Sequence, residues 1–136
     1  MKKGTHSYQV DVRNKYILIN INGELFSREK AKISVFDSGF LLGDGVWEGI
    51  RLFNGQLVFL KEHIKRLYDG AKSISIKIKQ DPEQLVDEIK HTLNANKMHS
   101  GVHVRLIISR GRKITPYQHP NANTGDSTLV IIPEYK

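Results

Sequence analysis

The sequence predicts an α+β domain in which an antiparallel or mixed β-sheet, built from hairpins, packs against two α-helices. Asn-Gly pairs at residues 22–23 and 54–55 are strong signals for two-residue hairpin turns. Residues 60–74 and 82–96 have the apolar periodicity of amphipathic helices. Two apolar stretches, 101–111 and 128–132, come after both helices. This order favours α+β over repeated βαβ units.

Size and composition indicate a single globular domain. The chain has 136 residues, of which 39% are hydrophobic and 26% charged. No apolar run approaches the roughly 20 residues of a membrane span, and no signal peptide is recognisable. The net charge is +7, but the Lys and Arg residues are dispersed. We therefore expect neither a nucleic-acid nor a membrane partner. The absence of cysteine excludes disulfides and fits a cytoplasmic location.

The first elements in the chain form a hairpin. Residues 1–15 are polar and are expected to be an extended or partly disordered arm, so that the domain spans 16–136. Residues 16–21 and 24–26 are predicted as strands flanking the first Asn-Gly turn, and 32–36 as a third extended piece.

A glycine-rich segment follows at residues 37–51, with four glycines between Gly39 and Gly49. Glycine is costly inside regular elements, so this segment is expected to form neither a plain strand nor a plain helix. Either a ligand approaches its backbone closely, or it is a tight turn in which Asp44 caps the backbone.

The second hairpin is predicted from residues 46–53, the Asn54-Gly55 turn and residues 56–59. Side chains alternate along a strand, so one face carries Trp47, Gly49, Arg51 and Phe53. That face could be the floor of a ligand site. It could equally be a half-exposed surface on which Trp and Arg stack without a ligand.

The two helices have clear apolar stripes. In the first, the stripe is Leu60, Ile64, Leu67, Ala71 and Ile74, and the other side carries Glu62, His63, Arg66, Asp69 and Gly70. The second is predicted to start with Asp81 as N-cap, Pro82 at the first position and Gln84 completing a capping box. Its stripe is Leu85, Ile89, Thr92 and Leu93.

The strand at 101–111 is predicted to be two-faced. Its apolar face is Val102, Val104, Leu106 and Ile108, opposite His103, Arg105, Ile107 and Ser109. A long loop at 112–127 leads to the last strand. The six histidines lack ligand spacing, so no metal site is expected, and no Gly-x-Ser-x-Gly motif indicates a hydrolase.

Several motifs together resemble a known family. The stretch Phe40-Leu41-Leu42-Gly43-Asp44-Gly45-Val46-Trp47-Glu48-Gly49-Ile50-Arg51, followed by Asn54-Gly55 and by Glu62-His63-Ile64-Lys65-Arg66-Leu67, is similar to class IV (fold-type IV) pyridoxal-phosphate aminotransferases. That family includes branched-chain aminotransferases, D-amino acid aminotransferases and aminodeoxychorismate lyases. Residues 102–105 and 109–111 also fit, and the resemblance covers nearly the whole chain from Tyr16 onward.

The resemblance implies a function and a set of site residues. It implies a pyridoxal 5'-phosphate enzyme, amino acid and 2-oxo acid substrates as partners, and a homo-oligomer. Arg66 matches the phosphate-binding arginine, and the implied substrate wall is Trp47, Gly49, Arg51, His103 and Arg105. From the residues alone, Arg66 could instead be a surface arginine paired with Glu62 one turn earlier, and His63 is expected to be structural.

Two departures from the family pattern limit the prediction. Leu42 and His103 stand where branched-chain enzymes carry tyrosines, so the choice between branched-chain and D-amino acid substrates stays open. In the family, the lysine that binds the cofactor as a Schiff base lies in a C-terminal domain, and no lysine here matches it; Lys65 and Lys72 are expected to face solvent.

The chain is therefore expected to be the N-terminal small domain only, with no catalytic residue of its own and inactive alone. The alternatives are an aminodeoxychorismate lyase-like enzyme of the same family, or a non-catalytic module that binds an anion or a partner protein.

Overall fold

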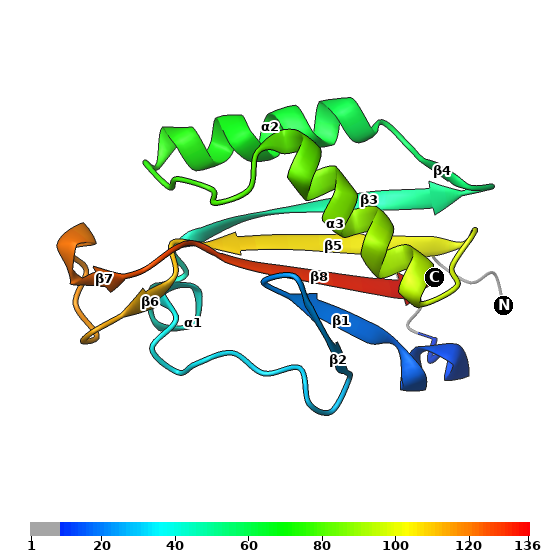
Figure 1. Ribbon diagram of the computed structural model, residues 1–136, viewed down its shortest axis with the longest axis horizontal. Coiled ribbons are helices and arrows are strands. Elements are labelled where there is room, and N and C mark those ends of the chain that lie inside the picture. Colours follow the sequence, from blue (N-terminus) through cyan, green and yellow to red (C-terminus); the bar gives the residue numbers. More distant parts are fainter. Residues whose placement is uncertain (1–8) are drawn as a thin grey trace, which may run out of the picture.

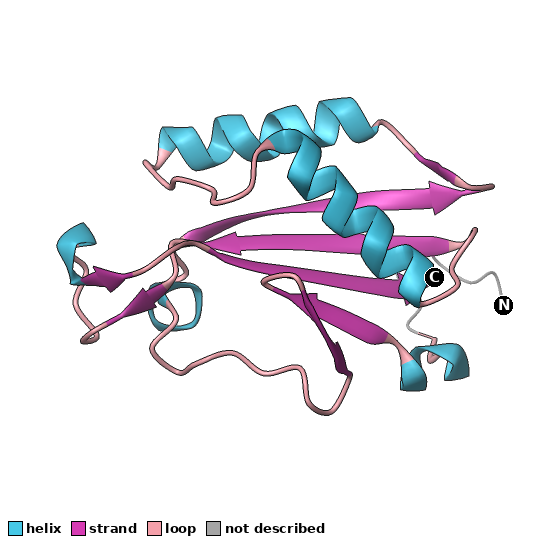
Figure 2. Ribbon diagram, viewed as in Figure 1, coloured by secondary structure: helices cyan, strands magenta, loops and turns pink. Residues whose placement is uncertain are grey.

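The computed structural model describes residues 9–136 as a six-stranded antiparallel sheet with two long helices on one face (Figures 1 and 2). The strands are β1 Leu18–Ile21, β2 Glu24–Ser27, β3 Gly45–Phe53, β4 Gln56–Leu57, β5 Val102–Ser109, β6 Arg112–Lys113, β7 Asn123–Thr124 and β8 Thr128–Tyr135. The α-helices are α1 Ser38–Leu42, α2 Leu60–Ser73 and α3 Pro82–Ala95, and the 3-10 helices are η1 Val12–Tyr16 and η2 Pro120–Ala122.

The strand order in the sheet is β2-β1-β8-β5-β3-β4, and each pairing is antiparallel. Strands β6 and β7 form a separate two-stranded ladder beside the main sheet. The predicted α+β class with a hairpin-built sheet and two packed helices is confirmed.

The hydrophobic core lies between the sheet and the two long helices. Both predicted helix stripes are buried there, except that Leu60 lies at the margin of the core and Ile74 is exposed. The sheet contributes its alternate residues, and the fully buried ones among them are Ile50, Val102, Val104, Leu106, Ile108, Leu129 and Ile131. Each buried side chain of this size contributes about 1.5–3 kcal/mol. Packing therefore fixes which face of β3 and β5 is left open.

Local turn and cap chemistry confirms the predicted hairpins and helix start. Asn22 and Gly23 have φ of 54° and 90°, and Asn54 and Gly55 have φ of 47° and 76°, the left-handed values that two-residue hairpin turns require. The Asp81 carboxylate accepts a hydrogen bond from the Gln84 backbone N–H, and the Gln84 side chain closes the capping box.

The glycine-rich segment departs from the expectation, because it does contain a plain helix and a plain strand. Asp37 caps the five-residue helix α1, which Gly43 ends in the left-handed conformation at φ 65°. Strand β3 then begins at Gly45, where an added Cβ would lie 2.6 Å from the Ile108 carbonyl oxygen. Gly43 thus ends a helix, and Gly45 allows two strands to pack closely. The number of glycines in the segment does not distinguish these two roles.

Further segments differ from the sequence prediction. The predicted loop at 112–127 contains β6, η2 and β7, and the strand predicted at 56–59 ends at Leu57. Residues 32–36 form no strand, because the Asp37 N–H donates to the Ser34 carbonyl and closes a turn there. At the N-terminus, residues 1–8 of the expected arm lie outside the described residues, and the next part coils into η1, with Asp11 as its cap, before β1 begins at Leu18. Within residues 9–136, no helix is long and apolar enough to cross a membrane.

Candidate functional site

The open face of the sheet brings together the five residues predicted to bind substrate. Strands β3 and β5 pair so that Gly49 lies opposite Arg105 and Arg51 lies opposite His103. Trp47 is on the same face of β3 and is 61% exposed, whereas Glu48 between Trp47 and Gly49 points to the helix side and is buried. The predicted alternation along β3 is confirmed, and β5 adds its own open-face row beside it.

Trp47 and Arg105 stack across the two strands. The Arg105 guanidinium carbon lies 4.1 Å from the centroid of the Trp47 ring, within the range of a cation–π contact. One reading of the sequence is that Trp47 stacks with an arginine of its own strand. The arginine found in contact comes from the neighbouring strand, which is set by the register of the sheet rather than by spacing along the chain.

His103 lies directly over Gly49. A Cβ added to Gly49 would be 2.6 Å from His103 Nε2, so the absence of a side chain at position 49 makes room for the imidazole. Burial lowers the pKa of His103, and the nearby charges of Lys136, Arg105 and Arg51 lower it further, against an opposite effect of Glu134. A neutral imidazole among cations leaves this patch suited to a carboxylate.

An apolar cavity of about 220 Å³ adjoins this patch. Its lining includes Phe40, Gly45, Trp47, Ile107 and Val130, with Asp37 and Ser109 as polar members. Helix α1 and the loop before it supply one wall, and the open face of β3, β5 and β8 supplies the other. Hydrophobic space beside a cationic patch is suited to a small molecule that has one apolar and one anionic end.

Arg66 lies on the other side of β3 and is held by Glu48. Arg66 Nε donates to Glu48 Oε1 at 2.6 Å, and Nη2 donates to Oε2 at 2.8 Å. His63 Nδ1 is 2.7 Å from the same Oε2. The partner of Arg66 is thus Glu48 of β3, and the alternative pairing with Glu62 is not seen among the described residues.

The cluster of Glu48, His63 and Arg66 has a marked gradient of exposure. The side chain of Glu48 is 5% exposed, that of His63 22% and that of Arg66 72%. The Arg66 guanidinium holds the pKa of Glu48 below its ordinary value, and the His63 hydrogen bond acts in the same direction, against the effect of burial. The carboxylate is therefore ionised at neutral pH and accepts from both donors.

Sequence reasoning missed Glu48, although a signal was present. The alternation that placed Trp47 and Gly49 on the open face places Glu48 with Ile50 and Leu52 on the buried one. A carboxylate in an apolar row needs a cationic partner, and the helix that follows directly on this hairpin carries Arg66.

Arg66 and the open-face residues flank one edge of the sheet without meeting. Strand β4 pairs with Leu52 and Phe53 of β3, and the Val58 N–H after it donates to the Arg51 carbonyl. The outer edge of β3 from Gly45 to Ile50 therefore faces no strand among the described residues. Helix α2 runs along this edge (Figure 1). A ligand lying beside the edge could reach Arg66 with one end and the open face with the other.

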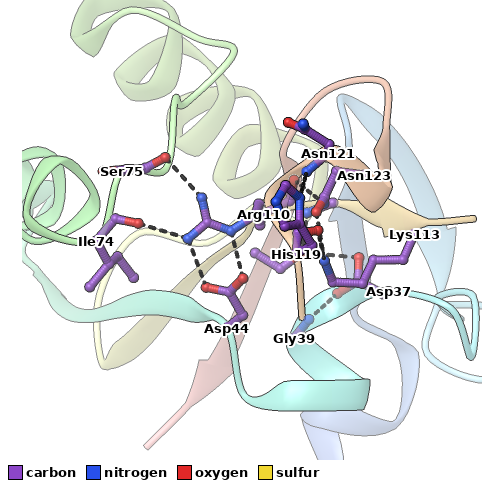
Figure 3. Close-up of polar contacts among 12 residues, drawn as sticks. Asp37, Gly39, Asp44, Ile74, Ser75, Arg110, Lys113, His119, Asn121 and Asn123 are labelled. Carbon is purple, nitrogen blue, oxygen red and sulfur yellow. Dashed lines mark hydrogen bonds and ion pairs between the residues drawn. The ribbon is translucent and has the colours of Figure 1, made fainter. Parts of the chain in front are cut away.

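A network of polar contacts at one end of β5 holds the surrounding elements in place (Figure 3). Arg110 pairs with Asp44 through Nε at 2.6 Å and donates to the backbone carbonyls of Ile74 and Ser75 at the end of α2. The sequence predicts that Asp44 caps the glycine-rich turn. That part is taken by Asp37, which accepts from the Gly39 N–H and the Ser109 hydroxyl.

The chain matches the family model of amino-transferase class IV over residues 45–135. It is 38% identical over 123 residues to branched-chain-amino-acid aminotransferase-like protein 1 of Arabidopsis thaliana, covering 90% of this chain and 22% of the relative. It is 46% identical over 93 residues to a putative branched-chain-amino-acid aminotransferase of Methanocaldococcus jannaschii, covering 68% and 32%. It is 33% identical over 115 residues to D-alanine aminotransferase of Bacillus licheniformis, covering 85% and 40%.

Solved structures agree with these sequence matches. Branched-chain amino acid aminotransferase from Escherichia coli superposes with a TM-score of 0.76 at 26% identity, covering 88% of this chain and 41% of that one. A second branched-chain amino acid aminotransferase, complexed with N-(5'-phosphopyridoxyl)-L-glutamate, gives 0.74 at 30% identity, covering 88% and 40%. A 4-amino-4-deoxychorismate lyase from Pseudomonas aeruginosa, with a TM-score of 0.66 at 24% identity and coverage of 86% and 39%, shares the fold. The chain spans between about a fifth and two fifths of the length of these relatives.

Proposed function

Because this chain belongs to the class IV aminotransferase family, we propose that it forms part of an enzyme that transfers an amino group between an amino acid and a 2-oxo acid. The proposed cofactor is pyridoxal 5'-phosphate, and the proposed substrates are branched-chain or D-amino acids, as the names of the relatives suggest. The observation that carries the proposal is the placement of Arg66 and of the cationic open face on the two sides of one free strand edge.

The exposed guanidinium of Arg66 fits the phosphate group of this cofactor. Its Nε and one Nη2 hydrogen are engaged by Glu48, and no further partner of the guanidinium is found within residues 9–136. The remaining N–H groups form the planar fork that matches phosphate oxygens. When bound, pyridoxal phosphate supplies the electron sink for the reaction, while Arg66 holds the phosphate end of the molecule.

The open face fits the amino acid. Arg105 and Arg51, on either side of the neutral His103, would hold a carboxylate. Gly49 makes room for the His103 imidazole on that face, and Trp47 covers one side of the patch. The adjoining apolar cavity would take an aliphatic side chain and exclude water from it.

We further propose that the chain is inactive without the remaining length of its relatives, since no lysine in it matches the cofactor lysine of the family. The expected homo-oligomer and cytoplasmic location stay predictions.

A chimera tests the proposed function. This chain would replace the matched segment of the Escherichia coli branched-chain amino acid aminotransferase, and retention of pyridoxal phosphate and amino transfer would be measured with L-leucine or D-alanine. Arg66→Lys keeps the charge but loses the fork, so it should raise the cofactor dissociation constant about tenfold, and Arg66→Ala should raise it further.

The matched control is Lys65→Ala, which removes the neighbouring exposed cation of α2 and its surface pair with Asp69. It should leave retention unchanged. Equal retention in the Arg66→Ala and parent chimeras would rule out Arg66 as the phosphate anchor, and amino transfer by the 136-residue chain alone would rule out its proposed inactivity.

A further inference from the structure

Strand β3 places a carboxylate where an apolar side chain would stabilise the core without any partner. Glu48 alternates with Ile50 and Leu52 toward α2, and its side chain is 5% exposed. Burying a charge is costly unless it is paired and hydrogen-bonded. The two donors that compensate Glu48 both come from α2, namely His63 and Arg66, which are one turn apart. Stability alone does not account for an acid at this position.

The way Glu48 contacts Arg66 fixes the direction of the guanidinium. The carboxylate accepts hydrogen bonds from one side of the guanidinium, from Nε and Nη2, and leaves the end with both Nη atoms open. A guanidinium has five N–H donors, so this pairing leaves three, and two of them, one on each Nη, form the fork at the end of the group. Because Glu48 is buried and Arg66 is 72% exposed, the free end points away from the protein. The pairing therefore holds ready the part of Arg66 that a phosphate would contact.

His63 holds Glu48 in turn. An ionised carboxylate only accepts hydrogen bonds, so His63 Nδ1 carries the proton that is shared with Glu48 Oε2 at 2.7 Å. Oε2 then accepts from both His63 and Arg66, while Oε1 accepts from Arg66 alone. With both oxygens engaged, the rotation of the carboxylate is restricted, and with it the plane of the guanidinium.

We propose that Glu48 is a positioning residue for an anion site, in which it orients Arg66 toward a phosphate group while His63 locks the orientation of Glu48. This role rests on the proposed function of Arg66 and adds to it the reason why the fork is held in a fixed orientation by the protein itself. Removal of Glu48 would leave the charge of Arg66 in place, but the guanidinium would no longer be held in one orientation.

A double-mutant cycle separates this role from simple charge effects. Inorganic phosphate would be titrated into the 136-residue chain, following the Arg66 Nε–H signal and the backbone amides of α2 by NMR. The variants are Arg66→Lys, Glu48→Gln and the two combined. In each background, the phosphate dissociation constant with Arg66→Lys is divided by the one with Arg66 intact. The loss of the Glu48 charge affects arginine and lysine alike, so a change in this ratio between backgrounds reports on the orientation of the fork.

In the wild-type background, Arg66→Lys should raise the phosphate dissociation constant about tenfold, because a held fork is lost. In the Glu48→Gln background, the same change should raise it by no more than about twofold, since the fork is already released. Glu62→Gln is the matched control. It removes an equal charge from an exposed position on α2 and should preserve the tenfold ratio.

His63→Ala provides a second test if Glu48→Gln fails to fold. It leaves the pair of Glu48 and Arg66 intact but frees the carboxylate, so it should broaden the Arg66 Nε–H signal and reduce the ratio below that of the Glu62→Gln control. A ratio that stays tenfold in Glu48→Gln, or in His63→Ala where Glu48→Gln does not fold, would overturn the positioning role and leave Arg66 as an anchor. An Arg66→Ala chain that binds phosphate like the wild type would overturn the anchor itself.

Discussion

Gly45 and Gly49 lie on the same strand, but a side chain at each would meet a different kind of neighbour. At Gly45 an added Cβ would be 2.6 Å from the carbonyl oxygen of Ile108, which is fixed in the ladder between β3 and β5. At Gly49 it would be 2.6 Å from His103 Nε2, the far end of a side chain that can rotate. The first glycine serves the fold, and the second serves the placement of His103.

We therefore expect Gly45→Ala to destabilise the chain by about 1–3 kcal/mol and Gly49→Ala by less than about 1 kcal/mol. Gly49→Ala should instead displace the imidazole toward solvent and raise the pKa of His103, whose depression comes first from burial. Thermal unfolding and an NMR titration of His103 measure the two effects. Equal destabilisation by both substitutions, with an unchanged His103 titration, would contradict this assignment.

The sign of the pH dependence follows from the same shift. The pKa of His103 is lowered in the folded chain, so folding favours the neutral imidazole. The corresponding stability is fully present above the unfolded pKa of about 6.5 and falls as the pH drops below it. Gly49→Ala should make the chain less sensitive to acid in that range.

Single residues were predictable where one periodicity determined them. Alternation along β3 placed Trp47, Gly49 and Arg51 correctly, and helical spacing placed the buried stripes. The contact between Trp47 and Arg105, and the position of His103 over Gly49, depend on the register between β3 and β5. Register is a tertiary property, so these contacts were not accessible from local sequence.

At the scale of elements, Arg110 connects three of them. It pairs with Asp44 just before β3, donates to the carbonyls of Ile74 and Ser75 just after α2, and itself follows β5 (Figure 3). The side chains of Arg110 and Asp44 are 18% and 21% exposed, so the pair is largely withdrawn from water. A cation at the C-terminal end of α2 also interacts favourably with the helix dipole.

Arg110→Met should therefore destabilise the chain by about 2–4 kcal/mol, because Asp44 and two carbonyls lose their partner. Arg110→Lys should recover part of this loss, since one ammonium cannot reach all of the acceptors. Lys65→Ala, which breaks an exposed pair on α2, should change the free energy of unfolding by less than about 0.5 kcal/mol. Chemical denaturation measures all three, and similar values for Arg110→Met and Lys65→Ala would contradict the connecting role.

Elements were predictable when their signals were local. Asn-Gly turns, the Asp81 capping box and two amphipathic stripes indicated both hairpins and both long helices. Helix α1 was missed because its N-cap, Asp37, is held in place by a hydrogen bond from the Ser109 hydroxyl on a strand far away in the sequence. Residues 32–36 were expected as a third extended piece but form no strand, since the turn from Ser34 to Asp37 overrides the β-prone composition there.

At the scale of the whole molecule, α2 and α3 cover one face of the sheet (Figure 2). The proposed substrate-binding residues lie on the other face. Arg66 is placed at the edge between the two faces, held from the covered side by Glu48. The central claim is that a single ligand spans this edge, with its phosphate at Arg66 and its carboxylate at the open face. Neither half of the site alone would distinguish an aminotransferase ligand from a simple anion.

N-(5'-phosphopyridoxyl)-L-glutamate, the compound bound in one of the branched-chain aminotransferase structures, tests this claim directly. Titrated into the 136-residue chain, it should shift the Arg66 Nε–H and the Trp47 indole N–H signals together, with one shared dissociation constant. Inorganic phosphate should shift the Arg66 signal alone. If the compound moves the Trp47 signal while leaving Arg66 unchanged, or moves the two with different dissociation constants, Arg66 and the open face do not belong to one site.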